Sequence, residues 1–130
     1  MFHIFENNQD RRQFGGSAFI EIQYCRLSSN TKLKKIVSVN SIRNWVEDSL
    51  YIFVDDIDSF IASYGSIFNM GTYNNVKKGF VDVYGINYYT VEDVKNLIDR
   101  ITKEKPIDYQ ILLEWLSKAY LYNGVYILGI

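Results

Sequence analysis

Side chains that could support catalysis or metal binding are few in this chain of 130 residues. His3 is the only histidine and Cys25 the only cysteine, so a zinc site would lack the nitrogen and sulfur ligands it needs. A nucleophilic pair would require these two residues to meet, but a lone cysteine at the end of an alternating segment is most often inert core. The glycine motifs of phosphate-binding loops and nucleophile elbows do not occur. We therefore expect no enzyme activity, no metal and no cofactor.

Carboxylates form the densest group of reactive side chains. Asp55, Asp56 and Asp58 lie in the segment VDDIDSF, which resembles part of a calcium-binding loop but lacks its glycine and its closing glutamate. If this segment is helical, Asp55 and Asp58 share one face, and Glu47 and Asp48 lie about two turns earlier. Two interpretations remain open, a solvated helix face or an acidic docking surface, and a metal or catalytic pair is the least favoured.

Charge is distributed unevenly along the chain, although its net charge is −1. Residues 11–35 contain six cations and one carboxylate, whereas residues 40–66 contain one cation and five carboxylates. Like charges within one segment repel one another unless a partner of opposite charge uses them. The acidic segment, flanked by Tyr51, Tyr64 and Tyr73, is the better candidate for a binding surface. The alternative is a small RNA-binding module that uses residues 11–35, although that segment has no clear platform for stacking bases.

The pattern of elements that must position these side chains predicts one α/β (α+β) domain over residues 1–130. We expect a small mixed or antiparallel sheet, about four helices packed on it, and the C-terminal strand within the sheet. A chain of this length buries roughly two-thirds of its unfolded surface and needs no disulfide to hold its core. No apolar run approaches the roughly 20 residues of a membrane span, and the charged N-terminus does not resemble a signal peptide. With its single cysteine, the protein is expected to be cytoplasmic.

The first half of the chain carries the weaker local signals. Residues 1–16 predict a short apolar arm or helix. Residues 18–25 alternate between apolar and polar positions, which predicts a strand with one solvated face. The apolar positions are Ile20, Ile22 and Tyr24, and the polar ones are Glu21 and Gln23. Residues 32–39 are compatible with a short strand.

Two helices are expected next. Asn40 or Ser41 can cap a helix that begins at Ile42. Residues 49–64 are ambiguous, because residues 50–54 are rich in β-formers while the apolar spacing of the whole segment matches a helix. Seven apolar positions fit the helical template, so we favour the helix.

The second half of the chain carries stronger signals. Residues 80–84 and 86–89 are rich in β-formers, interrupted at Gly85. Thr90 begins a helix through a capping box with Asp93. Pro106 ends this helix and begins another. The apolar face of the second helix comprises Ile107, Ile111, Leu112, Trp115, Leu116 and Ala119.

The end of the chain predicts a turn and a strand. Asn123 and Gly124 supply a left-handed helix stop. Residues 125–130 (VYILGI) are nearly all apolar and too short for a helix, which predicts a strand inserted in the sheet.

The last third of the chain, residues 84–130, also carries a family likeness. Its residues are Gly85, Asn87-Tyr88-Tyr89-Thr90, Lys105-Pro106, Leu113-Glu114-Trp115-Leu116, and Gly124 with Tyr126-Ile127-Leu128-Gly129-Ile130. This stretch resembles the immunity proteins of bacterial contact-dependent growth inhibition systems. The resemblance implies a small cytosolic protein that binds one cognate toxin domain and blocks it.

Such toxins are commonly nucleases, several of them acting on tRNA, and an acidic face complements the basic cleft of a nuclease. We expect the free protein to be a monomer that contacts neither nucleic acid nor membrane directly. The expected toxin-binding residues are Glu47, Asp48, Tyr51, Asp55, Asp56, Asp58, Tyr64 and Tyr73.

Overall fold

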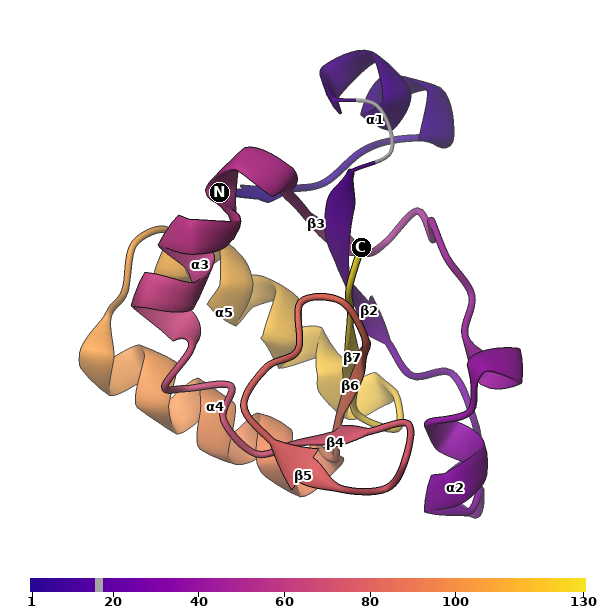
Figure 1. Ribbon diagram of the computed structural model, residues 1–130. Helices are drawn as coiled ribbons and strands as arrows, with labels where there is room; N and C mark the ends of the chain where they lie inside the picture. The colour runs from indigo at the N-terminus through magenta and orange to yellow at the C-terminus, as the bar shows by residue number, and fades with distance from the viewer. Residues whose placement is uncertain (16–17) are drawn as a thin grey trace.

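A computed structural model describes residues 1–15 and 18–130. Within these residues one antiparallel sheet of seven strands, in the order β1-β3-β2-β7-β6-β4-β5, lies between helices (Figure 1). The strands are β1 (Phe2–His3), β2 (Phe19–Tyr24), β3 (Leu50–Phe53), β4 (Gly71–Tyr73), β5 (Lys78–Gly79), β6 (Ile86–Tyr89) and β7 (Val125–Leu128). The helices are α1 (Asn8–Gly15), α2 (Leu33–Ile36), α3 (Ile57–Tyr64), α4 (Val91–Glu104) and α5 (Tyr109–Ser117). The predicted α+β class and single compact domain are confirmed.

β2 and β7, the two strands that the sequence indicates most clearly, lie side by side at the centre of the sheet. β7 lies between β2 and β6, with Ile127 opposite both Ile22 and Asn87, so the prediction of an inserted C-terminal strand is confirmed. Gly124 immediately precedes β7 and has φ 83°, the left-handed conformation that favours glycine. A Cβ there would lie 2.2 Å from the Tyr89 carbonyl oxygen.

The main hydrophobic core lies between one face of the sheet and α3, α4 and α5 (Figure 1). Ile20, Ile22 and Tyr24 of β2 point into it, as the alternation predicts. Helix α4 begins with the predicted capping box, in which Thr90 Oγ1 accepts from Asp93 N at 3.0 Å and Asp93 accepts from Thr90 N at 2.9 Å. This cap satisfies backbone donors that a helix N-terminus leaves unpaired.

The opposite face of the sheet is also covered, so the prediction that β2 has a solvated face is wrong. Residues 26–49, which we call the strap, cross this face through α2 and a 3₁₀ turn at Val39–Ser41 (Figure 1). Ile36 and Val37 of the strap pack with Tyr88 and Tyr126 in a second, smaller core. Glu21 and Gln23 are therefore each only 3% exposed.

Several elements of the first half differ from those predicted. Residues 32–39 form α2 and a turn rather than a strand, and no helix begins at Ile42, since Trp45 has φ 64°. The helix predicted over residues 49–64 is half correct, because β3 and a 3₁₀ turn at Val54–Asp56 precede α3. Leu50–Phe53 becomes a strand because β2 and β1 pair with it on its two sides.

Two further predictions are corrected at the periphery. Residues 80–84 lie outside any strand, and β5 precedes them. The predicted arm of residues 1–16 contains β1 and α1, and its last residue, Gly16, lies outside the described residues. Both sheet edges are strands of only two residues, and short edges limit pairing with other chains.

Candidate functional site

The predicted acidic segment is divided by β3. Glu47 and Asp48 lie in a turn before the strand, and Asp55, Asp56 and Asp58 lie after it. Four strand residues at about 3.3 Å each separate the two groups by about 13 Å. The five carboxylates therefore do not share one helix face.

Two of the predicted binding tyrosines are core residues, which corrects their assignment to a docking surface. Tyr51 is 2% exposed and Tyr64 is fully buried. Their hydroxyls donate to the carbonyl oxygens of Val46 and Ile107, respectively. Burial raises the pKa of both phenols well above the ordinary value of 10.0. Tyr73 is half-buried and donates to the Phe80 carbonyl.

The three aspartates after β3 remain available to a partner. Asp55 and Asp58 are exposed and Asp56 is half-buried, and within residues 1–15 and 18–130 none of them forms an ion pair. A fourth carboxylate, Asp108, follows Ile107, whose carbonyl accepts from the Tyr64 hydroxyl of α3, so Asp108 lies near the end of that helix. We call Asp55, Asp56, Asp58 and Asp108 the α3 acidic surface.

Neighbouring groups set the character of this surface. Oδ2 of Asp108 forms an ion pair with the amino nitrogen of Met1 at 3.1 Å. Burial and that ammonium group lower the pKa of His3 below 6.5, against the opposing effect of Asp56 and Asp108. A neutral His3 adds no cation there at pH 7, so the surface keeps its negative charge.

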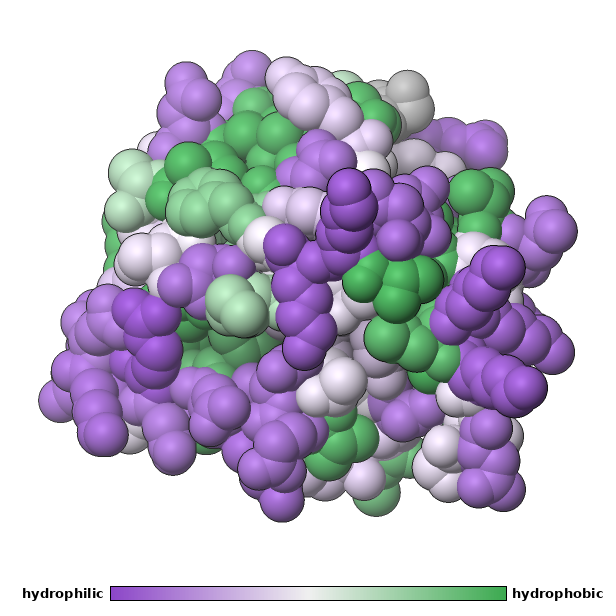
Figure 2. All heavy atoms as spheres, turned by 60° about the horizontal axis from the view of Figure 1, so that its bottom comes forward, coloured by the Kyte–Doolittle hydropathy of each residue, from purple (hydrophilic) through white to green (hydrophobic). Residues whose placement is uncertain are grey.

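Exposed apolar side chains accompany these carboxylates. Ile107 and Ile111 are 59% and 42% exposed, so their assignment to the apolar face of the second helix is wrong. Tyr64 of α3 contacts the backbone of Ile107, which places this residue beside α3. Figure 2 shows, on the face turned forward from the bottom of Figure 1, hydrophobic side chains in patches between hydrophilic ones. Protein interfaces combine an apolar core with a polar rim, and exposed apolar side chains with carboxylates around them are compatible with that arrangement.

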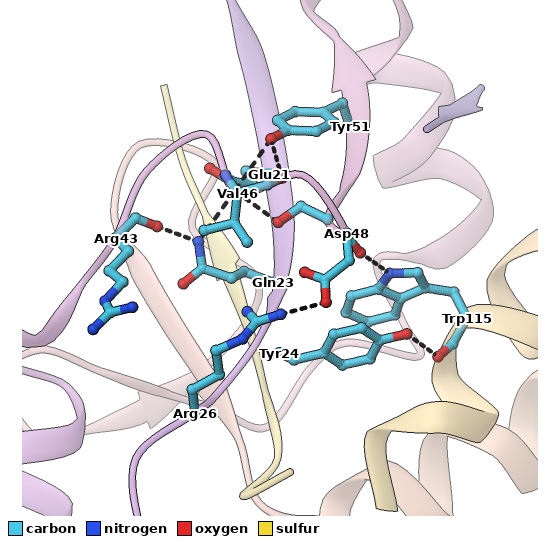
Figure 3. A network of polar contacts seen from close by, with 10 residues as sticks. Glu21, Gln23, Tyr24, Arg26, Arg43, Val46, Asp48, Tyr51 and Trp115 are labelled. Carbon is cyan, nitrogen blue, oxygen red and sulfur yellow. Dashed lines mark hydrogen bonds and ion pairs between the residues drawn. The ribbon is translucent and has the colours of Figure 1, made fainter. Parts of the chain in front are cut away.

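The carboxylate of Asp48 is paired with a cation, and this residue has a structural role. It forms an ion pair with Arg26, and its carbonyl oxygen accepts from Trp115 Nε1 at 2.8 Å (Figure 3). Tyr24 stacks on Trp115 with ring centroids 3.9 Å apart and on Tyr122 at 4.6 Å, and the guanidinium of Arg26 lies 5.1 Å from the Tyr122 ring. This closed arrangement joins the end of the strap to α5.

Sequence reasoning missed the role of Glu21, whose buried carboxylate organises the strap. Its Oε2 accepts from Trp45 N at 2.7 Å, and its Oε1 accepts from Val46 N at 2.9 Å and Ser49 Oγ at 2.7 Å. Gln23 Nε2 donates to the same oxygen at 3.1 Å and also to the Arg43 carbonyl (Figure 3). Successive backbone N–H groups therefore enclose the carboxylate as they would a bound anion. A glutamate at an alternating strand position was the only signal in the sequence.

The predicted basic segment does not form one surface. Arg11 is 3% exposed, and its guanidinium lies 3.6 Å from the ring centroid of Trp45. Arg26 is paired with Asp48. The remaining cations are divided between α1 and α2, which lie at opposite ends of the molecule in Figure 1.

The groups considered for catalysis or metal binding are not assembled in the described part of the chain. Cys25 is buried, and its thiol donates to the Tyr126 hydroxyl at 3.5 Å. The described residues contain no cluster of three or more His, Cys, Asp or Glu side chains placed to hold a metal ion. None of the helices described has the length and apolar character needed to cross a bilayer.

Comparisons with protein-family models, curated proteins and solved structures give no match for this chain.

Proposed function

We propose that this chain is a cytoplasmic immunity protein of a contact-dependent growth inhibition system, and that its α3 acidic surface binds the cognate toxin domain. The observation that carries the proposal is a group of aspartates at the start of α3, Asp55, Asp56 and Asp58, which form no ion pair among the described residues, together with exposed Ile107, whose carbonyl Tyr64 contacts from the end of the same helix. The likeness of residues 84–130 to such immunity proteins supplies the class of partner. A toxin with a basic, phosphate-binding cleft is the natural complement of this surface.

The structure narrows the proposed contact residues. Glu47 lies at the other end of β3, and Asp48 is held by Arg26. Tyr64 supports the surface from within the main core, whereas Tyr51 lies on the strap side of the sheet, where its hydroxyl donates to the Val46 carbonyl. Asp108, which the sequence did not single out, joins the surface from the residue before α5, next to Ile107 and the end of α3.

Growth rescue tests the function itself. The proposal predicts that a gene for a large secreted protein lies immediately upstream and that its C-terminal domain arrests growth when produced in the cytoplasm. Co-expression of this chain should restore growth. Failure to restore growth or to bind the purified domain would overturn the proposed function.

A variant with three substitutions, Asp55→Asn, Asp56→Asn and Asp58→Asn, tests the surface separately. If each charge contributes about 1 kcal/mol across the interface, toxin affinity should fall about 100-fold and depend less on salt. The matched control replaces Asp99 and Glu114, exposed carboxylates on α4 and α5, with Asn and Gln and should bind normally. Rescue by wild-type protein together with unchanged affinity of the triple variant would reject the surface and keep the function.

A further inference from the structure

The N-terminal arm, formed by β1 and α1, presents apolar side chains to solvent next to the start of α3. Phe14 is 53% exposed, and its ring centroid lies 4.4 Å from that of His3 and 6.1 Å from that of Phe53. Val54, the residue after Phe53, is 37% exposed. We call Phe14, Phe53 and Val54 the arm patch.

Contacts on two sides of the arm fix the position of Phe14. β1 pairs with β3, with Phe2 opposite Ile52. On α1, Arg11 is 3% exposed and its guanidinium lies 3.6 Å from the ring centroid of Trp45. Phe14 follows Arg11 by three residues and is therefore its neighbour on the helix. A ring that is already held in place loses little conformational entropy when a partner covers it.

The charged groups around the arm patch are mostly carboxylates. Val54 is followed directly by Asp55. Asp10 precedes Phe14 by four residues within α1, which places both side chains on one face of that helix. Residues 4–15 and 53–58 carry one exposed cation, Arg12, and five carboxylates that reach solvent and form no ion pair in the described structure, namely Glu6, Asp10, Asp55, Asp56 and Asp58.

Charge also decides toward which end of α3 a basic partner extends. At the C-terminal end of α3, the residues before Ile107 include Lys103 and Lys105, both exposed and without an ion pair among the described residues. These cations repel a basic partner. A specific interface takes about 20–30 residues from each side, more than the α3 acidic surface supplies. The contact therefore extends toward α1, which lies at the same end of the molecule as the start of α3 (Figure 1).

We infer that the toxin of the proposed function binds the arm patch together with α3, and that Phe14 enters an apolar pocket of the toxin whose rim carries lysine or arginine side chains. This inference rests on the proposed function and adds the residue that anchors the contact. The cationic rim faces Asp10 of α1 and Asp55 after Val54. Aromatic rings surrounded by a polar rim are frequent anchors of protein interfaces. A second copy of this chain is disfavoured, because a two-fold contact would bring these carboxylates against one another.

Affinity for the toxin domain, the C-terminal domain encoded immediately upstream, tests the anchor with the full chain. Phe14→Ser should weaken binding of the purified domain about 30-fold or more, the loss expected when an anchor ring is truncated. Phe14→Leu, which keeps an apolar side chain, should recover part of this loss. The matched control is Leu121→Ser, which removes a side chain that is 81% exposed beside Cys25, at the opposite end of β2 from Phe19. This control should leave the affinity unchanged.

Two further measurements do not depend on how well Phe14→Ser folds. Asp10→Asn changes an exposed side chain and should weaken toxin binding about twofold to fivefold and reduce its salt dependence. A photoreactive benzoyl group on the ring of Phe14 should cross-link to the toxin domain. The same phenylalanine analogue in place of Leu121 should not cross-link.

The outcomes separate this inference from the proposed function. If the wild-type protein binds the toxin domain, but Phe14→Ser binds equally well or the analogue at residue 14 does not cross-link, the arm patch is not the anchor and the proposed function stands. If the wild-type protein neither binds the domain nor restores growth, both fail. A dimer of the free chain that Phe14→Ser converts to a monomer would assign the arm patch to self-association and overturn the inference.

Discussion

Replacing Glu21 with glutamine should release the strap from the sheet. The carboxylate accepts hydrogen bonds from Trp45 N, Val46 N, Ser49 Oγ and Gln23 Nε2 at 2.7–3.1 Å while only 3% exposed. The Tyr51 hydroxyl lies 3.4 Å from the same oxygen, but its one proton goes to the Val46 carbonyl at 2.6 Å. Four donors therefore depend on this carboxylate.

The expected loss of stability can be worked from these contacts. In its best orientation, the glutamine oxygen keeps three donors, and its NH₂ group faces the N–H of Trp45. One charge-assisted bond, worth about 1.5–3 kcal/mol, is lost, and three others weaken by about 1 kcal/mol each. Removing a buried charge offsets part of this loss. We expect the free energy of unfolding to fall by about 3 kcal/mol.

Urea denaturation followed by tryptophan fluorescence measures this change. For 130 residues, about 3 kcal/mol corresponds to a fall in Tm of about 11 °C. Hydrogen exchange at the Trp45 and Val46 amides should accelerate roughly 100-fold. The control is Glu47→Gln, an exposed carboxylate in the same loop, which should change stability by less than about 0.5 kcal/mol. If Glu21→Gln were as stable as this control, the carboxylate could not be what holds the strap.

Three further predictions concern the helix cap, the turn before β7 and the buried tyrosines. Thr90→Ala should lower the free energy of unfolding by about 1 kcal/mol, and Thr90→Ser, which keeps the hydroxyl, should recover most of the loss in the same urea assay. Gly124→Ala should lower the free energy of unfolding by more than about 2 kcal/mol, because alanine would have to adopt φ 83° and its Cβ would lie 2.2 Å from the Tyr89 carbonyl oxygen. A loss as small as that of Thr90→Ala would contradict this prediction. Burial raises the pKa of six tyrosines above 10.0, so the stability they contribute is complete below pH 10 and is lost as the pH rises through their folded-state values. Phenolate absorbance should therefore show these six ionising together with alkaline unfolding, and their ionisation in the folded protein near pH 10 would refute the assignment. They are Tyr24, Tyr51, Tyr64, Tyr88, Tyr89 and Tyr126.

The predictable parts of the fold are those whose signals lie within a few consecutive residues. The Thr90 capping box, the strand β2 with Ile20, Ile22 and Tyr24 facing the main core, the left-handed Gly124 and the apolar strand after it all occur as predicted. Each depends on local backbone geometry or on a side-chain period that neighbouring residues complete. The candidate site was less predictable, because exposure depends on what packs against a side chain.

Residues 50–53 show where a local signal fails. Their apolar spacing suits a helix, but pairing with both β2 and β1 makes them a strand, since hydrogen bonds to neighbouring strands are not encoded in the segment itself. This one difference separates Glu47 and Asp48 from the three aspartates that follow. Ile107 and Ile111 likewise match a helical stripe, yet among the described residues no element covers them fully, and they remain exposed.

The sequence by itself determined the α+β class, the central strands, the cap of α4 and the scarcity of catalytic side chains. Tertiary structure decided that both faces of the sheet are covered and which charges are free. The strap buries Glu21 and Gln23, Arg26 neutralises Asp48, and Trp45 covers Arg11, whereas Asp55, Asp56 and Asp58 stay unpaired in the described structure. The physical reason is that charge pairing and burial depend on contacts between residues distant in the chain, which no local pattern of residue types records.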